Sequence, residues 1–356
     1  MLGCAWVLAA SLVSAAAADD VVLEKPKKQR GVFGYAISPD GTRIAGGTGE
    51  VTRRADGRNK MSGGEVVLWD ARSGKLSETL GSHDGTVDWV SFAADGELLA
   101  SCSYEDGVVQ WWDVPAGKPK GEIELEGAHF GECEPVLSPD GRWVVTVSDV
   151  PFQVGVRGRH RGGEVSIWKL DDGQEAWSIP ESHAQTAAID PSNRSLAVAM
   201  RELQWRQNAN GQWAGRPVRE EIVLYDLASG EARHQRKLQA MDLCYTADGK
   251  SLAALIWTGV LILSTEDLSI QRRLEISGDN WALELAADGG SFGLFHERNR
   301  VVEVRGMADG ALLRRFESGA GRSLARPALS RDLTRVVGDF GADPILRDVP
   351  EVTGEG

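Results

Sequence analysis

Short segments in which apolar and polar residues alternate run along the chain, and tight-turn residues separate them. One such segment is Val87-Asp88-Trp89-Val90-Ser91-Phe92, which the turn Ala94-Asp95-Gly96 separates from the small apolar segment Leu98-Leu99-Ala100-Ser101-Cys102. Alternation with a period of two residues is typical of a half-buried β-strand, and Asp-Gly pairs favour tight turns. The pattern therefore predicts an all-β chain of short strands joined by turns.

The turn between these two segments recurs along the chain. Its Asp-equivalent positions are 40, 95, 140, 192, 248, 288 and 332, and successive positions are about 49 residues apart on average. Propeller blades need about 40–45 residues each, so the remaining residues are expected in longer loops. The chain therefore contains seven repeated units.

Each unit also offers a third and a fourth strand. The third strand ends in an aromatic residue and an acid, as in Trp69-Asp70 and Trp112-Asp113, and a glycine turn such as Ser73-Gly74-Lys75 follows it. The fourth strand is a segment such as Leu76-Ser77-Glu78-Thr79-Leu80. Four antiparallel strands repeated seven times predict a single seven-bladed β-propeller over residues 19–350.

The second unit resembles a WD40 repeat. The resemblance rests on Ser82-His83, Phe92, Asp95-Gly96, Leu99-Ala100-Ser101, Trp112-Asp113 and Gly117-Lys118. It extends over nearly the whole chain after residue 18 but weakens in units five to seven, where Ile262-Leu263-Ser264 and Glu303-Val304-Arg305 replace the Trp-Asp pair. The WD40 family implies a buried hydrogen-bond relay, for which this unit offers His83, Ser101 or Ser103, Asp106 and Trp112. His129 and His183 hold equivalent loop positions, and all three histidines are expected to be structural.

The seventh unit ends without a fourth strand. Val21-Val22-Leu23-Glu24 stands before the first unit without a partner of its own. We expect this N-terminal strand to pair into the last blade, because that pairing closes the ring and covers an exposed sheet edge. Residues 351–356 follow as a C-terminal tail.

The first eighteen residues form an apolar run that ends in four alanines, which is typical of a signal peptide cleaved near Ala18. They predict export to the periplasm or the extracellular space, with no membrane span in the mature chain. A frayed tail on a cytoplasmic chain is the alternative, and Cys4 is too near Met1 for a lipoprotein signal to precede it. Cys102, Cys133 and Cys244 have no metal-site spacing and no complete set of disulfide partners.

Three insertions between the second and third strands carry most of the candidate binding chemistry. Residues 48–64, 148–163 and 200–220 each have a net charge of +2, although the whole chain has −13. Equivalent loops of a propeller emerge on one face, so these insertions predict a basic face. The candidate partner-binding residues are Arg53, Arg54, Arg58, Lys60, Arg157, Arg159, His160, Arg161, Trp205, Arg206, Trp213, Arg216 and Arg219.

The third insertion also contains Asn210-Gly211, a strong hairpin signal. A two-residue turn there would place Trp205 opposite Arg216, within reach of a cation–π contact. Exposed Arg and Trp residues on loops are typical of recognition surfaces, but the same composition also fits solvated loops whose tryptophans fold over the rim.

These features predict a non-catalytic interaction scaffold. Its basic, Trp-bearing face would bind an acidic protein, a peptide or an anionic polymer, whereas the net negative charge disfavours nucleic acid. The sequence contains no metal-site, nucleophile-elbow or phosphate-loop motif, so no cofactor and no metal are predicted. The alternative is a hydrolase or lyase whose site is assembled from propeller loops.

Overall fold

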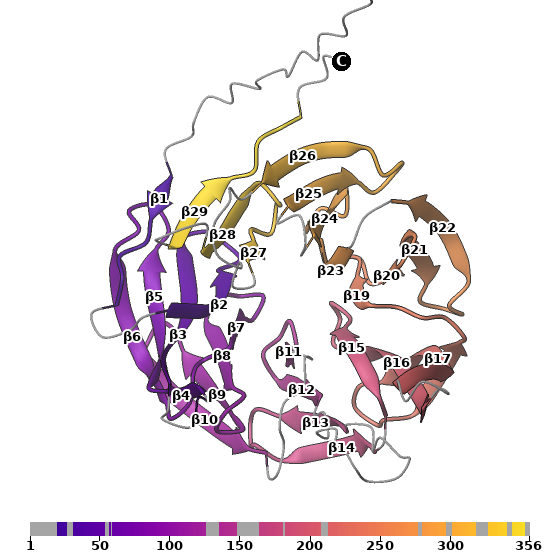
Figure 1. Ribbon diagram of the computed structural model, residues 1–356, viewed down its shortest axis with the longest axis horizontal. Helices are drawn as coiled ribbons and strands as arrows, with labels where there is room; N and C mark the ends of the chain where they lie inside the picture. Colours follow the sequence, from indigo (N-terminus) through magenta and orange to yellow (C-terminus); the bar gives the residue numbers. More distant parts are fainter. Residues whose placement is uncertain are drawn as a thin grey trace, which may run out of the picture.

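Seven β-sheets stand around a central axis in the computed structural model (Figure 1), which confirms the predicted seven-bladed, all-β propeller. The structure describes residues 20–26, 31–53, 57, 59–125, 135–147, 164–180, 182–207, 213–276, 280–296, 301–317, 327–339 and 344–352. Among them there is no helix long and apolar enough to pass through a bilayer. Each blade is antiparallel, with its first strand next to the axis.

The strands follow the chain order except at the point of closure. Blade 1 contains β2 (Gly31–Ile37), β3 (Arg43–Arg53), β5 (Gly64–Asp70) and β6 (Leu76–His83), with β4 (Asn59–Ser62) paired to β3. Blade 2 contains β7 (Trp89–Phe92), β8 (Leu98–Ser103), β9 (Val108–Asp113) and β10 (Lys118–Glu124). Blade 3 contains β11 (Val136–Leu137), β12 (Trp143–Val147), β13 (Val165–Lys169) and β14 (Glu175–Ile179). Blade 4 contains β15 (Ala184–Ile189), β16 (Ser195–Gln207), β17 (Trp213–Asp226) and β18 (Ala232–Arg236).

The last three blades repeat this order. Blade 5 contains β19 (Asp242–Tyr245), β20 (Ser251–Ile256), β21 (Gly259–Ser264) and β22 (Ile270–Glu275). Blade 6 contains β23 (Asn280–Leu285), β24 (Ser291–His296), β25 (Val301–Gly306) and β26 (Leu312–Glu317). Blade 7 contains β27 (Ala328–Leu329), β28 (Arg335–Asp339) and β29 (Pro344–Asp348), and β1 (Val21–Val22) is its fourth strand.

The hydrophobic core lies between the blades, because each sheet packs both of its faces against its neighbours. One cluster joins Ala199 and Ile222 of blade 4 to Leu243 and Leu252 of blade 5. The opposite face of blade 4 contributes Val198 and other alternate residues to a cluster shared with blade 3. Blades are therefore held to one another by apolar burial on both sides, which leaves their connecting loops outside the core.

The ring closes through the N-terminal strand. Val21 and Val22 of β1 pair with Leu346 and Ile345 of β29. The next residue, Leu23, is only 1% exposed and packs in a cluster shared by blades 7 and 1. The residues before and after β1 add polar ties, since Asp20 forms an ion pair with Arg347, and the Glu24 carbonyl accepts a hydrogen bond from Trp69 Nε1 at 2.8 Å.

The expected C-terminal tail begins with two residues that lie against blade 6. Arg314 of β26 forms an isolated antiparallel bridge with Glu351 and an ion pair with its carboxylate at 2.6 Å. The amide of Val352 donates a hydrogen bond to the carbonyl of Leu313 at 2.9 Å. Residues 353–356 lie outside the described part of the chain.

Candidate binding face

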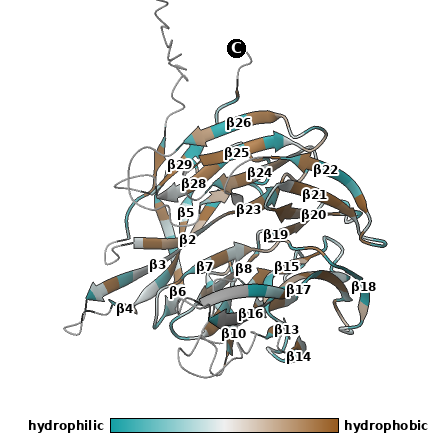
Figure 2. Cartoon of the chain, turned by 45° about the vertical axis from the view of Figure 1, so that its right-hand side comes forward, coloured by the Kyte–Doolittle hydropathy of each residue, from teal (hydrophilic) through white to brown (hydrophobic). Residues whose placement is uncertain are grey.

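The connections between second and third strands emerge on one side of the disc, which we call the insertion face. The turns between first and second strands, and between third and fourth strands, lie on the opposite side, the turn face. Two connections on the insertion face are long enough to project from the disc as two-stranded ribbons (Figure 2). They belong to blades 1 and 4, and the third insertion, residues 148–163, lies outside the described residues.

The first ribbon is formed by the end of β3 and by β4. Its register pairs Glu50 with Ser62 and Arg53 with Asn59. Arg53 and Lys60 are exposed, whereas Arg54 and Arg58 lie outside the described residues. The insertion of blade 1 is therefore an ordered strand pair with two cations in solvent.

The second ribbon is formed by the outer halves of β16 and β17, and its register differs from the prediction. Trp205 pairs with Gly215 and Arg216 pairs with Gln204, so the predicted Trp205–Arg216 pair was wrong. The reason is a β-bulge: Glu202 pairs with Arg219 but Leu203 pairs with Pro217, which leaves Val218 as an extra residue. A single extra residue shifts every later pair by one position.

The predicted partner-binding residues of this ribbon differ in their surroundings. Arg216 is exposed, whereas Arg219 is half-buried and forms an ion pair with Glu221 at 2.5 Å. Arg201, at the ribbon base, forms an ion pair with Glu220 at 3.3 Å. The side chains of Trp205, Arg206 and Trp213 are outside what the structure describes, as are Arg157, Arg159, His160 and Arg161. Arg53, Lys60 and Arg216 therefore carry the exposed positive charge of the described ribbons.

The four relay residues meet at the interface between blades 1 and 2. His83 ends β6 of blade 1, and its Nε2 lies 2.9 Å from the Ser101 hydroxyl of blade 2. The same hydroxyl accepts a hydrogen bond from Trp112 Nε1 at 2.9 Å, and His83 Nδ1 lies 3.5 Å from Asp106 Oδ2. Of the two serines that the sequence left open, Ser101 makes these contacts.

Two members of the relay are deeply buried. His83 is 5% exposed, and Ser101 is fully buried. Burial raises the pKa of Asp106, but the contact with His83 and the amides of Val108 and Gly85 outweigh it, so this pKa is lowered overall. Trp112 also lies against Gly81, where an added Cβ would come within 2.3 Å of the indole ring. The relay thus locks the outer strand of one blade to the next.

In other blades, the residue equivalent to Trp112 has different partners. Trp168 of blade 3 donates to the Thr146 hydroxyl at 2.9 Å, so this blade keeps half of the relay. In blade 6 the tryptophan position holds Arg305, which forms an ion pair with Glu303 at 2.7 Å, and Glu303 in turn lies 3.4 Å from His296. The contact with His296 lowers the pKa of Glu303 to about 2, against the effect of burial and with the help of Arg305.

Trp257 is a candidate that sequence reasoning missed. It lies in the two-residue turn between β20 and β21 on the insertion face and is 61% exposed. The sequence did contain a signal, because Trp257-Thr258 separates two apolar strands that leave only a tight turn between them. An aromatic residue in such a turn has no place in the blade core.

The turn face carries acidic residues. Seven turns between first and second strands contain Asp40, Asp95, Asp140, Asp190, Asp248, Asp288 and Asp332. Their carboxylates accept backbone hydrogen bonds within the turns, as Asp95 does from Glu97 at 2.9 Å. The hydroxyl of Ser38 lowers the pKa of Asp40, and that of Thr246 lowers the pKa of Asp248. Six of these seven aspartates are exposed, all but Asp190, and their carboxylates add negative charge to this face.

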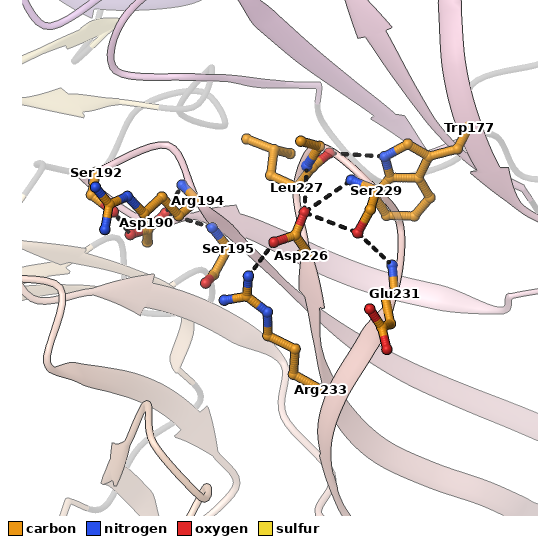
Figure 3. A network of polar contacts seen from close by, with 11 residues as sticks. Trp177, Asp190, Ser192, Arg194, Ser195, Asp226, Leu227, Ser229, Glu231 and Arg233 are labelled. Atoms are coloured by element: carbon orange, nitrogen blue, oxygen red, sulfur yellow. Dashed lines mark hydrogen bonds and ion pairs between the residues drawn. The ribbon is translucent and has the colours of Figure 1, made fainter.

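Blade 4 shows how such turns are held together (Figure 3). Asp190 accepts hydrogen bonds from the amides of Arg194 and Ser195 at 2.6 and 2.7 Å, and also from the Ser192 hydroxyl. In the next turn of the blade, Asp226 accepts a bond from the amide of Ser229 at 2.9 Å and forms an ion pair with Arg233. These contacts stabilise the turns, and in both aspartates each carboxylate oxygen has a hydrogen-bond or ion-pair partner.

A cavity of about 430 Å³ lies along the axis, and first strands of six blades line it. It includes Asp88, Cys244 and Glu284, but no histidine is among the described residues that line it. Burial raises the pKa of the Cys244 thiol to about 12, so it stays protonated at neutral pH. Burial also raises the pKa of Asp88. Within the described chain, no group of three or more His, Cys, Asp or Glu residues could hold a metal ion.

The fold places the chain in the class of seven-bladed β-propellers, and comparison with known proteins finds sequence matches. Residues 74–113 match the WD domain, G-beta repeat (WD40). The chain is 32% identical over 126 residues to the periodic tryptophan protein 2 homolog of Schizosaccharomyces pombe, a match covering 35% of this chain and 12% of that protein. It is 26% identical over 210 residues to the WD repeat-containing protein 26 homolog of Arabidopsis thaliana, covering 56% and 30%. These matches support the predicted resemblance to the WD40-repeat family.

The chain spans less than a third of the length of these relatives. A solved structure, the Kuenenia stuttgartiensis hydrazine synthase, superposes with a TM-score of 0.60 at 16% identity and covers 91% of this chain and 97% of the matched chain. At that identity the likeness shows the propeller fold alone.

Proposed function

We propose that the chain is a non-catalytic interaction scaffold whose insertion face binds an acidic protein or an acidic peptide segment. The observation that carries this proposal is the pair of ribbons on the insertion face, which hold the cations Arg53, Lys60 and Arg216 in solvent. WD40 propellers are in general scaffolds for protein interactions, and the family match supports that role here.

The contrast between the two faces supports an acidic partner. The turn face presents exposed aspartates, which disfavour an acidic protein, whereas the ribbons offer guanidinium and ammonium groups. Guanidinium binds carboxylate through paired hydrogen bonds, which an ammonium group reproduces poorly. An anionic polymer offers similar charge, and it becomes one outcome of the experiment below.

Shortened ribbons test this function directly. In one variant, residues 51–61 and 203–217 are replaced by short Gly-containing turns, and in a milder one Arg53, Lys60 and Arg216 become Gln. The full chain and both variants are crosslinked in extract from the source cells, and partners are identified by mass spectrometry. We expect acidic proteins to be recovered with the parent chain, less efficiently at higher salt, and to be lost with both variants.

The matched control replaces three exposed cations on outer strands, Arg273, Lys118 and Lys120, by Gln. This variant has the same change in net charge and should retain the partners. Undiminished recovery by the shortened-ribbon variant would show that the insertion face is not the binding site. Recovery of polysaccharide in place of protein would identify an anionic polymer as the ligand.

Export is part of the same proposal, and its basis is the apolar N-terminal segment ending at Ala18. Residues 1–19 lie outside the described residues, so the signal peptide stays a prediction. N-terminal sequencing of the protein from its native compartment should begin at Asp19. An intact Met1 on protein recovered from the cytoplasm would contradict export.

A further inference from the structure

The chain after β29 adds a short strand to the outer edge of blade 6, on the rim of the disc (Figure 1). Blade 7 takes its fourth strand from β1, so the residues that follow β29 do not form one. Pro350, Glu351 and Val352, which we call the tail strand, run antiparallel to β26 instead. In the described part of the chain, no other blade carries an added segment on its outermost strand.

The tail strand shows how this edge binds extended backbone. The amide of Arg315 donates a hydrogen bond to the Pro350 carbonyl at 3.1 Å, and the amide of Val352 donates to the Leu313 carbonyl at 2.9 Å. Strand addition of this kind derives its affinity from main-chain hydrogen bonds and its specificity from side chains at alternate positions. The edge of β26 is therefore a strand-addition site with an occupant from the same chain.

A carboxylate is selected between these two hydrogen bonds. Arg314 and Glu351 face each other as a non-hydrogen-bonded pair, in which the side chains of two antiparallel strands lie closest. The Arg314 guanidinium meets the Glu351 carboxylate at 2.6 Å and also donates to the Val349 carbonyl at 3.0 Å, which holds it in place. Only 26% of the Arg314 side chain is exposed. A fixed cation therefore specifies an acidic residue at one position of any added strand.

The tail strand fills this site incompletely. A hydrogen-bonded pair of antiparallel residues normally exchanges two bonds, but Pro350 has no amide hydrogen and can only accept the bond from Arg315. The Glu351 side chain is 71% exposed, and exposed ion pairs contribute little. Leu313 and Val352, which face each other in the next pair, are 43% and 46% exposed. A segment with an ordinary residue in place of the proline and a larger apolar side chain in place of the valine would make more contacts.

We propose that the outer edge of β26 is a second binding site, which accepts an extended segment of a partner protein with a carboxylate opposite Arg314, and that the tail strand occupies this site until the partner displaces it. The partner segment has a residue other than proline opposite Arg315, Asp or Glu next, and then a large apolar residue that covers Leu313. This site lies on the rim and uses none of the insertion-face residues, so it does not depend on the function proposed above.

Blade 5 provides a matched edge without an added strand. Its β22 has Arg272 at the position of Arg314, and this guanidinium donates to the carbonyls of Met307 and Ala308 in blade 6 at 2.7 and 3.0 Å. Both arginines therefore bind carbonyls of the next blade, but only Arg314 also meets a carboxylate of an added strand. Arg272→Glu is thus the control for Arg314→Glu, because it loses the same kind of contact between blades.

The probe is a fluorescein-labelled peptide, Val-Glu-Val-Thr-Gly-Glu, which has the sequence of residues 350–355 with Val in place of the proline. Its affinity is measured by fluorescence polarisation for the full chain and for an emptied variant, the full chain with Glu351→Lys and Val352→Pro. We expect at least tenfold tighter binding to the emptied variant, because in the parent the tail strand competes at high effective concentration. The peptide that keeps the proline should bind several-fold more weakly, because it lacks one amide donor.

Charge exchange places the peptide on the edge of β26. Arg314→Glu in the emptied variant should weaken binding at least tenfold, a peptide with Lys in place of its first Glu should restore it, and Arg272→Glu should leave it unchanged. No binding to the emptied variant, or equal binding with Arg314→Glu, would overturn the site. A dimer of the parent that disappears in the emptied variant would show that a second copy supplies the strand and would overturn the assignment to a partner. Thermal unfolding verifies each fold, and Val352→Pro alone replaces the emptied variant if the double change unfolds it.

Discussion

At the scale of single residues, the shared hydroxyl of Ser101 is the centre of the relay. Ser101→Ala leaves His83 and the Trp112 indole buried without this partner, and we expect a loss of about 1–3 kcal/mol in the free energy of unfolding. Urea denaturation measures it. Ser103→Ala is the control, since Ser103 is also fully buried but its hydroxyl makes no hydrogen bond within the described structure. Equal losses in the two variants would mean that the relay adds nothing beyond packing.

The ionic group of blade 6 should make stability depend on pH. The contact with His296 lowers the pKa of Glu303 in the folded protein to about 2, from an ordinary 4.5. A carboxyl with a lowered folded pKa stabilises the protein above its unfolded pKa, and this contribution falls as pH drops from about 4.5 to about 2. Melting temperatures of the parent should therefore fall more steeply across this range than those of Glu303→Gln, which should be lower at pH 7. Parallel curves would contradict the assignment.

Differences in residue type between equivalent positions of the blades explain which parts of the repeat could be predicted from the sequence. The spacing of the aspartate turns was enough to predict seven blades, because each turn has its own local hydrogen bonds. In blade 1, the hydroxyl of Ser38 donates a hydrogen bond to Asp40, two residues later. Blade 4 keeps this bond with the two residue types exchanged, because Ser192 donates to Asp190, two residues earlier. Such an exchange keeps the hydrogen bond of the turn but makes the repeat harder to recognise in the sequence. Blade 6 likewise has Arg305 in place of the tryptophan.

At the scale of elements, the register of the blade 4 ribbon depends on one residue. The Asn210-Gly211 signal predicted a pairing that would hold if the strands ran without interruption, but Val218 bulges and shifts the outer pairs. Pro217, next to Val218, is a local signal for the bulge, because proline has no amide hydrogen to donate and within a paired strand it is typical of bulges. The insertions of both blades were therefore predictable, whereas the residue pairs of the blade 4 ribbon required this proline to be taken into account.

Paired cysteines test this register. Cys substituted at Gln204 and Arg216, which are direct partners, should oxidise to a disulfide, whereas Cys at Trp205 and Arg216 should do so poorly. Deleting Val218 should keep this preference, because the pairs Glu202–Arg219 and Leu203–Pro217 then follow one another directly and the outer pairs do not change. Mass spectrometry of the oxidised proteins counts the crosslinks. A more efficient crosslink between positions 205 and 216 than between 204 and 216 in the parent ribbon would contradict the bulge.

The closing segment, formed by β1 and Leu23, should contribute to the stability of the whole ring. Leu23→Ala empties a buried position between blades 7 and 1, and we expect a loss of about 2–5 kcal/mol in the free energy of unfolding. Val22→Ala is the comparison, since Val22 is 54% exposed on the same segment and should cost little. Denaturant unfolding of the two variants measures the difference. Similar small losses would show that the ring is closed mainly by its other contacts.

At the scale of the whole molecule, the core and the candidate binding face are separate. The apolar clusters lie between blades and end where β3 and β16 leave their sheets, at about Thr48 and Met200, whereas the exposed cations and Trp257 stand beyond them. Residues of the insertion face can therefore be substituted without disturbing the fold. The position of the long insertions and their charge could be predicted from the sequence, but the ion pair that neutralises Arg201 could not, because it depends on the cross-strand neighbour Glu220. Arg219 pairs instead with Glu221, two residues along the same strand.

This separation predicts that the two ribbons can be removed without unfolding the ring. Replacing residues 51–61 and 203–217 by short Gly-containing turns deletes strand pairs whose described side chains contribute nothing to the interblade clusters. Loop closure changes little when a long connection becomes a short one, so the free energy of unfolding should stay within about 1 kcal/mol of the parent. Chemical denaturation gives this value, and the control is a variant in which only residues 51–61 are replaced, which isolates the blade 1 contribution. A drop of several kcal/mol in either variant would mean that a ribbon packs on the disc and stabilises it, and the binding face would then be part of the fold.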